Sequence, residues 1–388
     1  MNSSLRVEVL DDLREIDADD WDNCAGSENP FLRHAFLLAM EKHGCVGSGT
    51  AWRPQHLVVY RGDQLVGATP LYLKFDSYGE YVFDWAWADA YQRSGMQYYP
   101  KLVAAVPFTP VSGKRMLIAP GEDFAEIAGL LVDSALQHAR KLKVSSLHWL
   151  FTSEVDTQLL ENHGHLRRTG YQFHWCNEGY KSFDDFLASF SSAKRKKIKR
   201  ERRYVREADV VLEVFEGREL TNEHWQQFYT FYRSTIECRG AIPYLNIAFF
   251  KEIGATMADN IVMILASHDG KIVAGALNLK GDDTLFGRYW GSLGEFNSLH
   301  FETCYYRAIE YCIDKGLQRF EAGAQGEHKL SRGFLPSKTW SAHWLSHPEF
   351  SQAISRFLQR EHQGIDNYVD VLQSHSPFRQ SNGTSGNS

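Results

Sequence analysis

The sequence predicts a mixed α/β fold built from two similar domains in tandem. The chain has 388 residues, about twice the size at which a single hydrophobic core is usual. The same order of strands and helix also occurs twice along the sequence, at a spacing of about 200 residues. This spacing is far longer than a solenoid unit and is typical of a duplicated domain. Hydrophobic residues make up 43% and charged residues 23% of the chain, proportions that are typical of a globular protein.

The repeated order begins with a β-hairpin. Residues 54–74 and 259–280 each contain an apolar strand, a polar turn with glycine and aspartate, and a second apolar strand. In both copies the second strand has small residues near its start, including Gly67 in the first copy and Gly275 in the second. We expect a β-bulge or the close approach of another part of the chain at these residues.

Three more elements follow each hairpin: an aromatic strand, a helix and a short strand. They are expected at residues 81–91, 124–143 and 147–151 in the first copy, and at 284–292, 301–316 and 317–323 in the second. Apolar residues recur at helical spacing in both helix segments. Each half is therefore expected to have a mixed sheet covered by helices, with the order β-β-β-α-β.

We expect four regions along the chain. They are an N-terminal domain at residues 1–180, a basic linker helix at 181–210, a C-terminal domain at 211–373 and a tail at 374–388. The tail is rich in serine, glycine and other polar residues, so it is expected to be disordered.

Composition and motifs exclude several classes of protein. The longest apolar runs, such as residues 261–266, are far shorter than the roughly 20 residues that cross a bilayer, so no membrane span is expected. The start of the chain is acidic and lacks an apolar core, which excludes a secretion signal and predicts a cytoplasmic protein. No C-x-x-C pair, zinc-protease motif, phosphate loop, hydrolase elbow or dinucleotide fingerprint occurs, and no metal is expected.

A strongly basic segment lies between the two halves, although the net charge of the chain is −6. Ser191 or Ser192 can begin a helix, and lysine or arginine fills every position of 194–203 except Ile198 and Glu201. Such a helix can bind the phosphates of coenzyme A or of a tRNA end, or it can be a solvated linker. The candidates for donor binding are Arg195, Lys196, Lys199 and Arg202.

A second segment, residues 319–344, is a strand followed by a glycine-broken loop. Acyl transfer to an amine needs a base that removes the ammonium proton and donors that hold the developing oxyanion. His328, Glu327 or Glu321 can supply the base, and backbone N–H groups the donors, although a loop histidine is often only a structural hydrogen-bonding residue. Further candidates for binding in the same loop are Gln325, Lys329 and Arg332.

The aromatic strand expected at 284–292 contains one further candidate. Tryptophan and tyrosine in such a strand usually belong to the core. Arg288 alternates with Tyr289 and is therefore expected on the opposite face of the sheet, where it can contact a ligand.

Five segments of the chain are together typical of one family. They are NPFLRHAFLLAME, FSSAKRKKIKRERR, RSTIECRGAIPYLNIAFF, the strands around VAGALNL, and CYYRAIEYCIDKGLQRFEAGAQGEHKLSRGFLP. Through them the chain resembles, over about residues 30 to 370, the FemAB-like family, which is related to the aminoacyl-tRNA-dependent peptidoglycan ligases. The resemblance implies two tandem GNAT-like (acyl-CoA N-acyltransferase) domains and transfer of an acyl or aminoacyl group. It carries over no catalytic residue, and the coiled-coil arm of some related ligases has no counterpart here.

The segment where a GNAT domain holds the donor pyrophosphate is 291–306. Gly291 and Gly294 occur there, but Glu295 follows, and a carboxylate beside a pyrophosphate is unfavourable. The usual GNAT signature at this place is absent, which disfavours coenzyme A as the donor.

Two functions remain open at this stage. The first is an acyltransferase without a permanently bound cofactor, which uses aminoacyl-tRNA or acyl-CoA as co-substrate and a small-molecule or cell-wall precursor amine as acceptor. The second is a non-catalytic module that uses the basic helix to bind RNA or an anionic cell-wall precursor. Only an enzyme would form product.

Overall fold

A computed structural model describes residues 4–238, 240–324 and 326–379 of the chain. Its strands are β1 (Leu5–Leu10), β2 (Trp52–Pro54), β3 (His56–Arg61), β4 (Gln64–Thr69), β5 (Leu71–Lys74), β6 (Lys101–Ala104), β7 (Leu117–Ile118), β8 (Ser146–Thr152), β9 (Leu166–Cys176), β10 (Val211–Glu216), β11 (Ile261–His268), β12 (Lys271–Lys280), β13 (Thr284–Ser292), β14 (Arg319–Glu321) and β15 (Leu335–Leu345). Within the described residues, an eleven-stranded sheet has the order β10-β11-β12-β13-β14-β9-β15-β8-β6-β5-β2. A four-stranded sheet has the order β1-β3-β4-β7.

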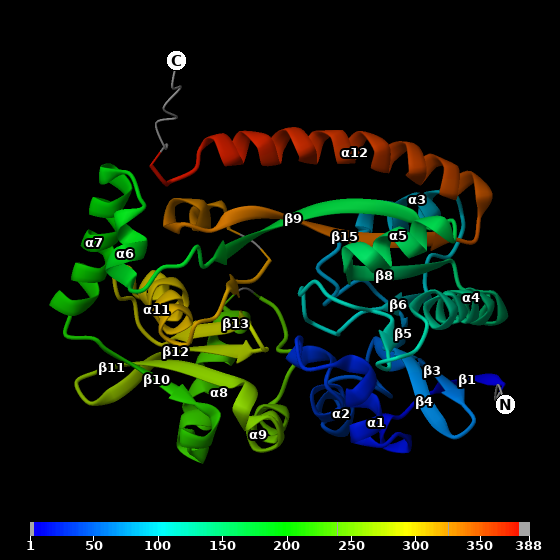
Figure 1. The fold of residues 1–388 in the computed structure, drawn as a ribbon, viewed down its shortest axis with the longest axis horizontal. Helices are drawn as coiled ribbons and strands as arrows, with labels where there is room; N and C mark the ends of the chain where they lie inside the picture. The colour runs from blue at the N-terminus through cyan, green and yellow to red at the C-terminus, as the bar shows by residue number, and fades with distance from the viewer. Residues whose placement is uncertain (1–3, 239, 325, 380–388) are drawn as a thin grey trace.

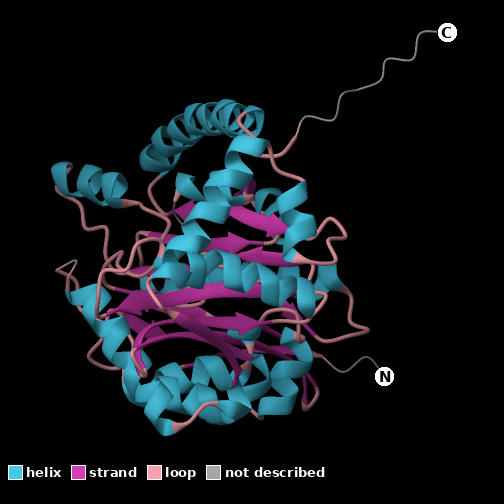
Figure 2. Cartoon of the chain, turned by 90° about the vertical axis from the view of Figure 1, so that its left-hand side faces the viewer, coloured by secondary structure: helices cyan, strands magenta, loops and turns pink. Residues whose placement is uncertain are grey.

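Helices cover the strands above and below, as Figure 2 shows. They are α1 (Ala18–Ala25), α2 (His34–Lys42), α3 (Trp85–Arg93), α4 (Phe124–Leu142), α5 (Glu154–Asn162), α6 (Phe183–Ala188), α7 (Ser192–Glu207), α8 (Asn222–Glu237), α9 (Ile247–Thr256), α10 (Leu299–Phe301), α11 (Arg307–Asp314) and α12 (Pro348–Ser374). Two shorter helical segments matter below: the π-helix η5 (Glu302–Tyr306) and the 3₁₀-helix η6 (Glu327–Arg332).

The two halves of the chain exchange their last strands. β9, which closes the first half, pairs with β14 of the second half. β15, which closes the second half, pairs with β8 of the first half and with β9 from Leu335 to His343. α12 then runs across β9 and β15 and spans both halves (Figure 1). The exchange joins the strands of the two halves into one continuous sheet.

The predicted hairpins are confirmed as β3-β4 and β11-β12. Each pair has a register shift next to the small residues: β4 bulges before Gly67, and β12 bulges before Ala274 and Gly275. A Cβ on Gly67 would lie 2.5 Å from Ile127 of α4, and one on Gly275 would lie 3.0 Å from Leu265. The expected bulge and close approach thus occur in both copies.

One predicted strand is wrong. Residues 81–91 form a turn and the first part of α3, whereas the corresponding segment in the second half is the strand β13, as predicted. Alternating Trp and Ala residues imitate the period of a strand, but Trp87 and Tyr91 lie four residues apart and are buried together on one side of a helix. The intervening alanines favour that helix.

The other predicted elements are observed with shorter or interrupted bounds. The helix expected at 124–143 is α4 and the strand at 147–151 is β8. The helix expected at 301–316 is α10, η5 and α11 in succession, and its π-helical part is of a type often found at functional sites. The strand at 317–323 is only three residues long, as β14.

The expected regions map onto the structure as follows. The segment 181–210 contains α6 and the basic helix α7, which Ser191 caps without a side-chain hydrogen bond. Of the tail at 374–388, residues 374–379 are described, and Phe378 lies 4.9 Å from Phe190 between ring centroids. Residues 380–388 lie outside the described part of the chain. Among the described helices, none is long and apolar enough to cross a membrane.

The halves also share a hydrophobic core. The rings of Phe31 and Phe286 lie 5.4 Å apart, and those of Phe36 and Phe249 lie 5.5 Å apart, each pair joining one residue from either half. All four are nearly inaccessible to solvent. Buried aromatic contacts of this kind fix the relative position of the halves.

Candidate functional site

The eleven-stranded sheet opens beside β14. This short strand pairs with β13 only over residues 284–286 and with β9 only over 174–176. Beyond Glu321 the chain leaves the sheet, so the rest of β13 and the rest of β9 have no strand between them.

Two cavities occupy the opening. The large cleft lies along β9 and has a volume of about 730 Å³. The inner cavity lies along β13 and has a volume of about 430 Å³. Ala324, Gly326 and His328 line both. The loop after β14 therefore separates the cavities, and His328 lies at their junction.

The remaining walls come from distant parts of the chain. The large cleft is lined by residues 81–83, 168–173 and 339–341, and by Phe151, Glu327, Glu361 and Ile365. The inner cavity is lined by residues 276–278, 287–290 and 322–323, and by His300, Cys304, Tyr305 and Lys329.

His328 is held at the junction by aromatic neighbours. Its Nε2 forms a 2.9 Å hydrogen bond with the Tyr305 hydroxyl, and its ring packs near Phe301. Partial burial, with Arg332, Lys329 and Lys197 nearby, lowers the pKa of His328 below its ordinary value. The imidazole is therefore mainly neutral at pH 7 and able to accept a proton.

Lys329 places a buried ammonium group at the inner cavity. Its side chain is 1% exposed, and Nζ donates a 2.7 Å hydrogen bond to the Gly323 carbonyl. Burial lowers the pKa of Lys329 to about 8. A cation in so dry a place can stabilise negative charge on a bound carbonyl oxygen more strongly than it would in water.

Arg332 and Arg202, both predicted to bind a ligand, instead pair with glutamates inside the protein. Arg332 donates to Glu201 at 2.8 Å and lies over the Phe301 ring at 3.4 Å. Arg202 pairs with Glu302 and Glu310 at 2.9 and 2.6 Å. These three ion pairs hold α7 against η5, η6 and α11, so the charges of both arginines are already matched by carboxylates.

The two glutamate candidates differ in environment. Glu327 is exposed, accepts a hydrogen bond from Tyr368 of α12 and lines the large cleft. Glu321 is 3% exposed, and its nearest charged or titratable partners are Arg319 at 3.4 Å and His174 at 3.9 Å. Glu321 lines neither cavity. Of these two candidates, Glu327 is therefore the one positioned to face a substrate in the large cleft.

Glu321 should make stability depend on pH. Burial raises its pKa from 4.5 to about 7, so the folded chain keeps a proton that the unfolded chain releases, and stability is lost as the pH rises through this window. Glu321→Gln should raise the free energy of unfolding at pH 8 by about 2 to 3 kcal/mol and change it little at pH 4.5. Urea unfolding at both pH values measures this. The exposed Glu213→Gln is the control, and an equal gain at both pH values would contradict the assignment.

Arg288 occupies a different position from the predicted one. Its guanidinium lies 5.0 Å from the Tyr289 ring centroid, and both residues line the inner cavity. The β12-β13 register shifts at Leu277 and Asn278, and this bulge breaks the alternation that would have separated the two side chains. Arg288 also donates to the Phe108 carbonyl, so it joins the second half to the first beside the cavity.

Apart from Arg202 and other partly buried cations, the basic helix α7 presents its lysines and arginines to solvent. Ile198, Glu201 and Val205 are its buried residues. Lys196 and Lys199 are exposed and Arg195 is half-buried, and none of these three forms an ion pair with another described residue. Gln325, the remaining candidate, lies outside the described residues.

Sequence reasoning missed most of the large cleft. Its residues come from β9, β15, α12 and the turn before α3, and no local motif marks any of these segments. Tyr305 was also missed, although the π-helix that contains it lies within the predicted helix. Only the loop after β14 carried a recognisable cluster of chemically active side chains.

Comparison with known proteins gives a family and a fold. The FemAB_like family model, described as peptidoglycan biosynthesis/recognition, matches residues 12–380. The structure is similar to that of FemX, with a TM-score of 0.56 and 13% identity over 88% of this chain and 98% of that one. It is also similar to a tandem GNAT protein from the clavulanic acid biosynthesis pathway, with a TM-score of 0.48 and 12% identity over 89% of this chain and 99% of that one. A third similar structure is L-PGS from Bacillus licheniformis, with a TM-score of 0.48 and 11% identity over 86% of this chain and 98% of that one. No curated protein sequence matches the chain. The family match, the similarity to FemX and the mixed sheet confirm the predicted fold class, two tandem GNAT-like α/β domains with mixed sheets.

Proposed function

This chain belongs to the FemAB-like family, and from that premise we propose that it transfers an aminoacyl group from tRNA to an amine. The observation that carries the proposal is the pair of cavities that meet at His328. A transferase of this kind must bring the reacting groups of two substrates together while the rest of each substrate is bound separately. Two cavities that share one wall allow this arrangement.

The inner cavity suits the acyl group of the donor. It lies where β13 and β14 separate, and Lys329 supplies a positive charge there. The large cleft suits the acceptor because it is larger and carries Glu327, Glu361 and backbone from the open edge of β9. An acceptor amine in the large cleft would then reach the donor carbonyl beside His328.

The proposed reaction uses two residues of the loop. The acceptor ammonium loses a proton, and its nitrogen attacks the ester carbonyl of the aminoacyl donor. Lys329 stabilises the negative charge that develops on the carbonyl oxygen. His328 takes the second proton from the attacking nitrogen. As the amide bond forms, the bond from the carbonyl carbon to the tRNA oxygen breaks, and His328 returns that proton to the oxygen.

The shape of α7 favours tRNA over coenzyme A as the donor. The helix has 16 residues and is about 24 Å long, so its cations can follow several phosphates of a nucleic acid. It contacts η6, and Lys197 is near enough to His328 to lower the pKa of that residue. In the segment expected to hold a pyrophosphate, Glu295 is exposed, and a carboxylate there is unfavourable for a pyrophosphate.

The proposal predicts salt-sensitive tRNA binding through α7. Replacing Lys196, Lys199 and Arg200 together by alanine should weaken binding of total tRNA at least tenfold at 0.1 M salt, a rough expectation for losing three phosphate contacts. It should also reduce the slope of log K against log salt by about 2 to 3. Filter binding at several salt concentrations measures both quantities.

The matched control replaces Lys141, Lys251 and Lys271, three exposed cations elsewhere on the molecule. This variant has the same net charge as the α7 variant, so it should bind tRNA as the wild type does. If both variants bind tRNA equally weakly, the effect comes from the overall charge of the protein and not from α7. A wild type that binds tRNA but transfers no labelled amino acid from charged tRNA to soluble cell-wall precursor peptides would instead be a binding module.

A further inference from the structure

A chain of buried polar side chains runs from the large cleft into the first half of the protein. It begins at Ser341, which lines the cleft and whose Oγ lies 2.8 Å from Nε2 of His343. Nδ1 of His343 lies 2.7 Å from Nδ1 of His148, and Nε2 of His148 lies 3.1 Å from the Tyr98 hydroxyl. Tyr98 donates to Asp84 at 2.6 Å. Each contact is within hydrogen-bond distance.

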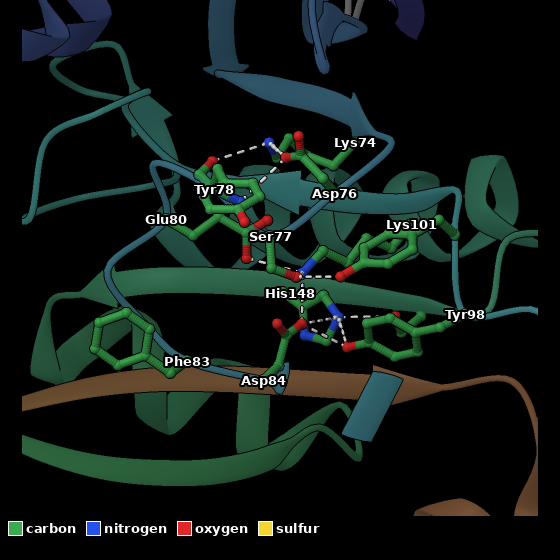
Figure 3. A network of polar contacts seen from close by, with 12 residues as sticks. Lys74, Asp76, Ser77, Tyr78, Glu80, Phe83, Asp84, Tyr98, Lys101 and His148 are labelled. Carbon is green, nitrogen blue, oxygen red and sulfur yellow. Dashed lines mark hydrogen bonds and ion pairs between the residues drawn. The ribbon is translucent and has the colours of Figure 1, made fainter. Parts of the chain in front are cut away.

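The chain ends at a buried lysine between two carboxyl groups. Figure 3 shows Lys101 reaching between Glu80 and Asp84, with Tyr98 and His148 beside Asp84. Lys101 donates to Asp84 and, at 2.8 Å, to Glu80. Every member from Ser341 to Glu80 is at most 4% exposed. One oxygen of Glu80 and one of Asp84 have no hydrogen-bond partner among the described residues, so either carboxyl has a free site for a proton.

We propose that this network is a proton relay that carries the proton of a cleft-bound ammonium group from Ser341 to the carboxyl group of Glu80. The proposal rests on the proposed function, which requires an amine acceptor to be deprotonated. The N–H bond of the ammonium breaks with its electron pair left on nitrogen. The Ser341 hydroxyl, the His343 and His148 rings and the Tyr98 hydroxyl each gain one proton and pass another on, so that a proton reaches Asp84. Lys101 donates a proton to Glu80 and takes the proton of Asp84 in its place, and the Glu80 carboxylate becomes a neutral acid.

The charges around Glu80 make it the better acceptor of the two carboxyls. Burial raises the pKa of Glu80 to about 7, against the lowering effect of Lys101. Burial also acts on Asp84, but Lys101 and His148 more than offset it and lower its pKa to about 2. Lys74, which pairs with Asp76, is the other cation that acts on Glu80. Glu80 can thus take up and release a proton near neutral pH.

The relay has a second end. Lys101 also donates to Ser77 at 2.8 Å, and Ser77 lies 2.8 Å from the hydroxyl of the half-buried Tyr99. A proton held on Glu80 can leave toward solvent by this branch, which resets the relay for the next turnover.

Infrared spectroscopy of the protein without substrates tests the relay. The C=O band of a protonated carboxyl group should titrate near pH 7 in the wild type and be absent in Glu80→Gln. After a rapid pH jump, the Ser341→Ala/Tyr99→Phe double variant, which closes both ends, should reach the same final band at least tenfold more slowly. Because no donor or acceptor is present, the result does not depend on whether the proposed transfer occurs.

Ser146→Ala is the matched control. Ser146 is buried and lies 2.7 Å from the same His148 nitrogen, but it lines neither cavity. It should change the rate less than twofold. A band that survives in Glu80→Gln, or a double variant that titrates as fast as the wild type, would overturn the proposal. The double variant removes only two hydroxyl groups, so it still tests the relay if Glu80→Gln does not fold.

Discussion

Replacing Arg332 by methionine is expected to lower the free energy of unfolding by about 3 to 5 kcal/mol, because the substitution leaves the buried Glu201 with only the more distant Lys197 ammonium, 3.9 Å away, as a charged partner. Both residues are less than a tenth exposed, and the Arg332 guanidinium also stacks on Phe301. Chemical unfolding of the two proteins at pH 7 measures the difference.

Two further variants make this prediction specific. Arg206→Met removes an exposed arginine from the same helix that carries Glu201 and should change stability by less than about 0.5 kcal/mol. Adding Glu201→Gln to Arg332→Met should recover much of the loss, since it removes the unpaired charge. A loss that persists in full would mean that packing on Phe301, and not the ion pair, holds the loop.

Lys329→Met should have the largest effect on activity. Loss of the cation at the inner cavity is expected to lower kcat/KM for aminoacyl transfer about 100-fold to 1000-fold, the range found when one donor to a developing oxyanion is removed. The free energy of unfolding should stay the same or rise, because a buried ammonium with a lowered pKa is itself destabilising. Steady-state kinetics and unfolding on the same preparations measure both.

The control for Lys329 is a cation that is equally buried. Arg115 is fully buried and donates to the Leu150 and Val111 carbonyls. Arg115→Met should lower stability but leave the kcat/KM of the folded enzyme within about threefold, a rough bound for a residue away from the chemistry. If Lys329→Met and Arg115→Met slow transfer equally, Lys329 has no special role in the reaction.

The parts of the fold that the sequence predicted are those with a local cause. A bulged hairpin with small residues can be recognised from a local pattern of about 20 residues, and so can an amphipathic helix. The prediction for residues 81–91 was wrong because Trp and Ala alternate there as they would in a strand. Only the tertiary packing of Trp87 and Tyr91 makes the segment helical.

The site was predictable only where chemistry is dense along the chain. The loop with His328 and Lys329 could be identified from its side chains. The large cleft and the relay could not, because they join residues far apart in sequence: His148 and His343, for example, are separated by 195 positions. For Arg202 and Arg332 the sequence predicted ligand binding where the structure has internal ion pairs. The sequence around a cation does not reveal whether that cation has a carboxylate partner in the fold.

The exchange of β9 and β15 between the halves also has a consequence for biosynthesis. As the chain leaves the ribosome from its N-terminus, β8 has no partner on one edge until β15, the last strand of the second half, has been made. The first half therefore stays incompletely folded until the second half has been synthesised. A gene fragment that encodes only residues 1–180 would expose the edges of both β8 and β9 and would favour intermolecular strand pairing.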